Sequence, residues 1–252
     1  MFTKRIIARL DIKGPNVVKG VHFEGLRVIG DPITLAKRYA DQGAHEILYI
    51  DTVASLYGRN QLEELIRETA EEIFIPITAG GGIRSLEDVR KLLNAGADRI
   101  AINTHALHQP NLISAIAEKY GSQAITVSIQ AKRNATGWEA YAESGRERTG
   151  MSVIGWANEA VAEGAGELLI TSIDRDGTMK GFDMELYEQI DVSVPVVACG
   201  GFGSLADIDI LNHGADAIAC ASVLHYDKLT IGEIDEYVNQ EQLSDTKRRA
   251  TG

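Results

Sequence analysis

The chain has 252 residues and a formal net charge of −11 at pH 7. That acidity excludes nucleic acid and anionic membranes as the main partner, although a local pocket can still hold a small anion. The two cysteines lie in apolar runs, which fits a reducing compartment without a disulfide framework. No signal peptide opens the chain, and no apolar run reaches the roughly 18 residues of a membrane span. We expect a soluble cytoplasmic protein.

Short apolar runs rich in β-branched residues alternate with amphipathic stretches from one end of the chain to the other. We predict strands at residues 5–10, 46–51, 75–79, 99–103, 124–129, 167–172, 194–198 and 217–221. We predict helices at residues 32–42, 61–72, 85–95, 110–120, 153–163, 184–189, 204–213 and 231–239. Nearly all-apolar strands are typical of parallel sheets buried on both faces. Strict alternation within about 250 residues predicts a (β/α)8 TIM barrel.

The sequence repeats itself internally. Residues 5–13 align with residues 124–132, and residues 76–88 with residues 195–207, both at an offset of 119. The repeat predicts one TIM-barrel domain over 1–252, built from half-barrels 1–122 and 123–241. The polar tail after residue 241 is expected to fray.

Each half contains a glycine-rich turn that leads into a helix, at residues 80–82 and 200–203. Backbone N–H groups at such a turn can hold an anion. Thr104 and Ser222 add hydroxyls at the adjoining strand ends. Tight strand-to-helix geometry alone would explain one such turn, but two copies predict a substrate with a phosphate at each end.

Polar residues end the predicted strands, at the face where barrel enzymes carry their active sites. These are Asp11, Asp51, Asn103, Thr104, Gln130, Thr171, Ser172 and Ser222, with Asp176 in the following segment. A bisphosphate across the mouth would place its middle over Asp11 and Gln130. Asp11 then either caps a loop turn or acts as a general acid or base. The long connections 13–31 and 131–151 are candidate lids.

Charged residues begin four strands at the opposite end of the barrel: Arg5, Glu46, Arg99 and Glu167. Solvated salt bridges at the barrel floor would explain this pattern, which by itself indicates no function. The histidines show no metal-ligand spacing, so we predict neither a metal site nor a cofactor.

Several motifs together resemble one family. They are Lys4-Arg-Ile-Ile, Leu10-Asp-Ile-Lys, Val17-Val-Lys-Gly, Gly80-Gly-Gly-Ile-Arg, Gly121-Ser-Gln, Gly164-Ala-Gly-Glu and Asp174-Arg-Asp-Gly-Thr. Over almost its whole length the chain is similar to the HisF family, the cyclase subunit of imidazole glycerol phosphate synthase. The resemblance implies a half-barrel-repeat TIM barrel in histidine biosynthesis that pairs with a glutaminase subunit. Ammonia from that partner would cross the barrel core. It would convert a bisphosphorylated ribulosyl-formimino-aminoimidazole carboxamide nucleotide to imidazole glycerol phosphate and aminoimidazole carboxamide ribotide.

The resemblance also implies roles for individual residues. Asp11 matches a catalytic aspartate, and Lys19 matches the lysine of a mobile loop. The two phosphate sites would be Gly82, Asn103 and Thr104, and Gly177, Gly201, Gly203 and Ser222. The ammonia gate would be Arg5, Glu46, Arg99 and Glu167. We expect further substrate contacts from Asp51, Thr171 and Asp176.

Two positions depart from the family pattern. Arg99 stands where lysine is usual, which keeps the charge but changes its shape. Gln130 stands where the family has its second catalytic aspartate. An amide cannot accept and return a proton at neutral pH, and losing such a group costs about 10²–10⁴-fold in rate. Either Asp11 carries cyclisation while Gln130 orients the substrate, or the chain is a HisF-like paralogue that channels ammonia for sugar amidination in polysaccharide biosynthesis.

Two further hypotheses stay open. The sister isomerase of the same pathway shares the half-barrel repeat and similar aspartates, but it needs no ammonia route, so the four floor charges favour the cyclase. A non-catalytic scaffold that activates a glutaminase and channels its ammonia to another enzyme is favoured by Gln130 alone.

Overall fold

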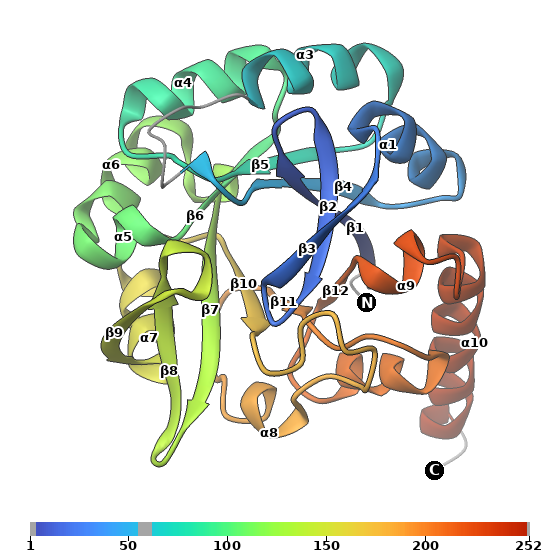
Figure 1. Cartoon of the computed structure of the whole chain (residues 1–252). Coiled ribbons are helices and arrows are strands. Elements are labelled where there is room, and N and C mark those ends of the chain that lie inside the picture. Colours follow the sequence, from blue (N-terminus) through green and yellow to red (C-terminus); the bar gives the residue numbers. More distant parts are fainter. Residues whose placement is uncertain (1–3, 55–61, 251–252) are drawn as a thin grey trace.

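The computed structural model describes residues 4–54 and 62–250. Eight parallel strands close into a barrel, because β12 pairs with β1 and β10 pairs with β7. The structure therefore confirms the predicted (β/α)8 fold (Figure 1). The barrel strands are β1 Arg5–Lys13, β4 Glu46–Asp51, β5 Ile77–Gly80, β6 Arg99–Ile102, β7 Ile125–Asn134, β10 Glu167–Ser172, β11 Val196–Cys199 and β12 Ala217–Cys220.

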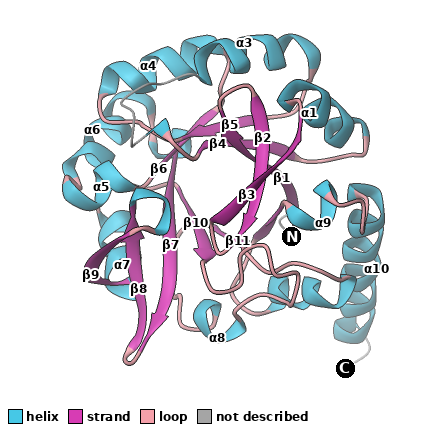
Figure 2. Cartoon of the chain, viewed as in Figure 1, coloured by secondary structure: helices cyan, strands magenta, loops and turns pink. Residues whose placement is uncertain are grey.

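Helices surround this barrel (Figure 2). They are α1 Pro32–Asp41, α3 Leu62–Glu72, α4 Leu86–Ala95, α5 Thr104–His108, α6 Asn111–Tyr120, α7 Val153–Ala162, α8 Met184–Tyr187, α9 Ser222–His225 and α10 Ile231–Ala250, with 3-10 turns at Ser122–Ala124, Glu143–Gly145 and Leu205–Asn212. In the described part of the chain, no helix is both long and apolar enough to cross a bilayer.

Two helix predictions differ substantially from the structure. The start of a third, residue 61, lies outside the described residues. The stretch after Ser204 forms a 3-10 helix, since Ile and Asp are weaker helix formers than Ala or Leu. The helix predicted to end at residue 239 continues as α10 to Ala250, so the tail after residue 241, which was expected to fray, is helical in the structure. No Gly or Pro interrupts the residues between those positions, so nothing local ends the helix.

The long connections after β1 and β7 are not loops but antiparallel hairpins. β2 Asn16–Val21 and β3 Glu24–Gly30 extend β1, while β8 Gly137–Ala142 and β9 Glu147–Ser152 extend β7. These four strands were not predicted, because the predicted ends of β1 and β7 fall three or more residues before their observed ends. Each hairpin brings its residues to the mouth of the barrel.

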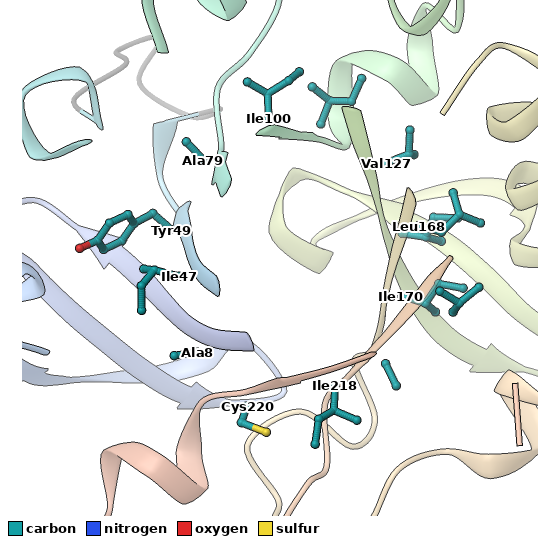
Figure 3. Close-up of a cluster of buried hydrophobic side chains, with 14 of the residues drawn as sticks. Ala8, Ile47, Tyr49, Ala79, Ile100, Val127, Leu168, Ile170, Ile218 and Cys220 are labelled. Carbon is teal, nitrogen blue, oxygen red and sulfur yellow. The ribbon is translucent and has the colours of Figure 1, made fainter. Parts of the chain in front are cut away.

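Side chains alternate along each barrel strand between two separate cores, as the period of a strand requires. Outward-facing residues such as Ile47, Val127 and Ile218 belong to the large core between strands and helices (Figure 3). A smaller apolar cluster fills the barrel interior: Ile7, Leu48, Ala101, Leu169, Val197, Cys199, Ala217 and Ala219. This interior cluster separates the charged floor from the polar mouth.

Candidate active site at the mouth of the barrel

Asp11 lies at the mouth on β1, where it pairs in register with Val18 of β2, and it is only 4% exposed. Arg9 Nε donates to Asp11 Oδ1 at 2.8 Å, and Lys19 Nζ donates to Asp11 Oδ2 at 3.4 Å. Burial favours the neutral carboxyl, but the two neighbouring cations outweigh it and lower the pKa of Asp11. Asp11 is therefore an ionised carboxylate with a cation on each oxygen.

Lys19 on β2 is 2% exposed and points into the mouth. Its Nζ lies 2.8 Å from each carboxylate oxygen of Asp176, in the segment after β10. Burial alone would lower the pKa of Lys19, but Asp176 and Asp11 raise it above its usual value. The hairpin that carries Lys19 is thereby tied down across the mouth.

Gln130 is the β7 residue at the mouth, paired in register with Thr171 of β10 and Tyr141 of β8. It is 9% exposed, and its Oε1 is buried with no hydrogen-bond partner among the described residues. A buried acceptor without a donor costs free energy unless a ligand supplies one. One cavity is lined by Gln130 together with Asp11, Lys19 and Asp176, so the structure brings these predicted residues together.

The first predicted phosphate site lies beside this centre. A cavity of about 250 Å³ is lined by Gly82, Asn103 and Thr104, and Gln130 forms part of its wall as well. The helix beyond the glycine turn, α4, begins after the N-cap residue Ser85, whose hydroxyl accepts a hydrogen bond from the backbone N–H of Asp88. Ser144 of the β8–β9 hairpin also lines the cavity, and the sequence analysis missed it because that hairpin was unforeseen.

Asp51 and Thr171 already have hydrogen-bond partners within the protein, so they are less available to a substrate than predicted. Asp51 lines the same cavity, but its Oδ1 accepts hydrogen bonds from the backbone N–H groups of Val53 and Ala54, both at 2.9 Å. Burial raises the pKa of Asp51. Thr171 is fully buried, and its hydroxyl accepts a hydrogen bond from Arg9 at 3.1 Å. Both residues contact the protein itself in this structure.

The second predicted phosphate site is built on close backbone approaches. A Cβ added to Gly177 would collide with the carbonyl of Gly20, and one on Gly203 would collide with the carbonyl of Met179. Gly201 has φ +112 and is equally crowded. Ser222 begins α9 at the end of β12, the strand next to β11. The glycines are needed for this geometry whether or not an anion binds.

The floor charges form a closed ring. Arg5 contacts Glu46 at 2.9 Å and also Glu167, while Arg99 contacts Glu46 at 2.9 Å and Glu167 at 3.9 Å. The carboxylates are 2% and 6% exposed. The salt bridges are therefore buried on the side of the acids, while the side chains of Arg5 and Arg99 stay 24% and 30% exposed. Burial raises the pKa of Glu46, although Thr78 donates to it at 2.7 Å.

Comparison with known proteins agrees with this geometry. Residues 5–230 match a family model described as "Histidine biosynthesis protein". The chain is 57% identical over 212 residues to the imidazole glycerol phosphate synthase subunit HisF of Legionella pneumophila, covering 83% of this chain and all of that protein. It is 46% identical to the HisF subunit of Myxococcus xanthus (strain DK1622), covering 96% of this chain and 98% of that protein.

The chain belongs to the HisF family. Two functional candidates in this HisF barrel are not among the residues predicted from the sequence. Arg9 is a buried arginine inside the first apolar run, and its burial in a strand was itself a signal that it must have a partner. His225 is 7% exposed, and its Nδ1 lies 2.8 Å from the hydroxyl of Tyr39. Burial lowers the pKa of His225 to about 4, so it is neutral at pH 7.

Proposed function

We propose that this chain is the cyclase subunit of imidazole glycerol phosphate synthase in histidine biosynthesis. With ammonia from a glutaminase partner, it converts a bisphosphorylated ribulosyl-formimino-aminoimidazole carboxamide nucleotide to imidazole glycerol phosphate and aminoimidazole carboxamide ribotide. The observation that carries this proposal is the mouth cavity shared by Asp11, Lys19, Gln130 and Asp176 in a HisF-family barrel.

The two glycine turns support a substrate with two phosphates. The turn after β5 opens onto the cavity lined by Gly82 and Thr104, and the turn after β11 follows a strand on another side of the barrel. Backbone N–H groups with a nearby hydroxyl are suited to a phosphate dianion, although at the second turn the N–H groups of Gly203 and Ser204 already donate to Asp207 at 2.9 and 2.8 Å. The reacting middle of the substrate would then lie over Asp11 and Gln130.

The charge states at the mouth support proton transfer during ammonia addition. Ammonia that adds to a carbonyl carbon must lose a proton, and the oxygen that leaves as water must gain protons. Asp11 has a lowered pKa, so it is ionised and can accept a proton, but the cations that lower this pKa also make it a weaker base. Lys19 has a raised pKa, so it is protonated and can donate a proton, but the carboxylates that raise this pKa also make it a weaker acid. Gln130 carries no exchangeable charge and would orient the substrate through its free Oε1.

The floor ring supports a partner that delivers ammonia. Its acids are buried while the side chains of Arg5 and Arg99 are 24% and 30% exposed, so the ring faces outward through its arginines. Above it the interior is apolar, and such a lining favours neutral ammonia over ammonium. A glutaminase that docks on this face would deliver ammonia into the barrel through its floor. We also propose that the whole chain is one domain of two half-barrels, 1–122 and 123–241.

The test is an assay of the purified chain with ammonium salt and the bisphosphate nucleotide, with imidazole glycerol phosphate as the product measured. Formation of that product at high ammonium supports the proposal, and its absence at every ammonium concentration contradicts it. Turnover of the preceding aminoaldose substrate would instead identify the isomerase. Both relatives named above carry the synthase name, and neither points to sugar amidination.

A further inference from the structure

Four residues of β1 face the barrel interior in a column: Arg5, Ile7, Arg9 and Asp11. Arg5 belongs to the floor ring and Ile7 to the interior apolar cluster. Arg9 comes next, 4% exposed, directly below Asp11 in the column. A guanidinium at this depth lies between the apolar interior and the polar mouth, and it must be held by specific partners.

Arg9 is anchored by two barrel strands that do not pair with β1. Its Nη1 donates to Thr171 Oγ1 of β10 at 3.1 Å and lies 3.2 Å from Cys199 Sγ of β11. Within the barrel β1 pairs with β12 and β4, so these contacts cross the interior instead of following the sheet. The ring of Phe23, from the β2–β3 hairpin, lies 5.8 Å from the guanidinium carbon. The guanidinium is thus fixed from three sides.

This anchoring determines how Asp11 is presented. Nε of Arg9 binds Oδ1 of Asp11, while Oδ2 faces Lys19 at the longer distance of 3.4 Å. Oδ1 is thus engaged by the short contact with Arg9, and Asp11 as a residue lines the mouth cavity. Charge stabilisation is mutual, because Arg9 and Asp11 each favour the ionised form of the other.

We propose that Arg9 is a positioning residue for Asp11, holding its carboxylate ionised and fixed through Oδ1. This inference rests on the proposed function, in which Asp11 transfers the proton. It gives Arg9 a particular importance in this chain. With an amide at position 130, proton acceptance at the inner mouth falls to Asp11, and Arg9 keeps that carboxylate in the form that accepts a proton.

The test is the pH profile of ammonium-dependent kcat in the full chain and in Arg9→Met, which keeps the length of the side chain but removes its charge. Activity through an ionised Asp11 is lost as pH falls through the pKa of that carboxyl. Without Arg9 this acid limb should move to higher pH by about one to three units. Arg9→Lys should restore part of the shift. Arg90→Met breaks a surface pair with Glu87 on α4 and should leave the profile unchanged.

A second measurement separates this inference from the proposed function. Carboxyl-carbon NMR of the folded protein follows the titration of Asp11 without any substrate, with Asp11→Asn providing the assignment. The Asp11 resonance should titrate at higher pH in Arg9→Met than in the wild-type chain. An unchanged Asp11 titration in folded Arg9→Met overturns the inference even if the chain is a cyclase. An inactive wild-type chain with a shifted titration would instead reject the proposed function and leave the Arg9 contact established.

Discussion

Lys19 Nζ bridges both carboxylate oxygens of Asp176 at 2.8 Å, joining two residues that are 157 positions apart in the chain. Next to this pair, the backbone N–H of His22 donates to the carbonyl of Asp176 at 2.9 Å. The β2–β3 hairpin is therefore closed onto the segment after β10. A substrate that enters the mouth must either fit beneath this hairpin or displace it.

Asp176→Asn should loosen the hairpin. The substitution removes the closer of the two carboxylates that hold Lys19 and leaves its buried ammonium with Asp11 alone, at 3.4 Å, which is costly. We expect faster amide hydrogen exchange in residues 16–30, together with at least a several-fold lower kcat/KM. Asp209→Asn, at an exposed site outside the mouth, is the control and should change neither quantity. Equal exchange in the hairpin of Asp176→Asn and of the wild-type chain would contradict this account of closure.

Gln130→Asp should raise ammonium-dependent kcat. An aspartate there can accept and return a proton, and such a group contributes about 10²–10⁴-fold in favourable cases. Gln130→Asn has the size of the aspartate without its charge and controls for the shorter side chain. If the two variants show the same kcat, position 130 has no part in proton transfer. Product formation with ammonium salt is the measurement.

Arg99→Met should uncouple glutamine hydrolysis from cyclisation in the enzyme assembled with its glutaminase partner. Its loss leaves Glu46 and Glu167 with Arg5 as their remaining partner in the floor ring. We expect the yield of imidazole glycerol phosphate per glutamine hydrolysed to fall several-fold. Activity with external ammonium, which reaches the mouth from solvent, should stay within about two-fold of wild type. A proportional fall in both would mean that the ring has a purely structural role.

His225 should make the fold less stable in mild acid. Its pKa is about 4 in the folded chain and about 6.5 when unfolded. The unfolded chain therefore binds this proton first, and stability is lost as pH falls from about 6.5 to 4, by roughly 3 kcal/mol in all. Urea unfolding across this window should give a smaller pH dependence for His225→Gln than for the wild-type chain. An identical pH dependence of the unfolding free energy in the two chains would contradict the lowered pKa of His225.

The barrel could be predicted from the sequence because its strands are buried on both faces. Such strands leave unbroken apolar runs, and each predicted run contains at least half of an observed strand. The outer hairpin strands β3 and β9 could not, because they are partly exposed and polar. Residues such as Val28, 66% exposed, and Arg27 follow no clear alternation. Pairing with β2, rather than local pattern, makes β3 a strand.

Part of the site could be predicted from the internal repeat of the sequence. Asp11 and Gln130 stand at equivalent positions of the repeat, so the sequence indicated that they meet at the mouth. The pairing of Lys19 with Asp176 joins distant segments and depends on how the hairpin folds back. Arg9 was missed because only the strand ends were searched for chemistry, whereas its guanidinium acts from inside the barrel.

Closure of the barrel by β12 and β1 has a consequence for self-association. A closed sheet offers no unpaired backbone to another chain. Within the described residues, β3 and β9 are the strands paired on one side only, and both belong to the mouth hairpins. Any strand added from a second molecule would therefore attach at the rim and crowd the substrate entrance. Glu24 and Arg27 on β3, and Glu147 and Arg148 on β9, place charges along these two edges, so the features that discourage aggregation also keep the entrance open.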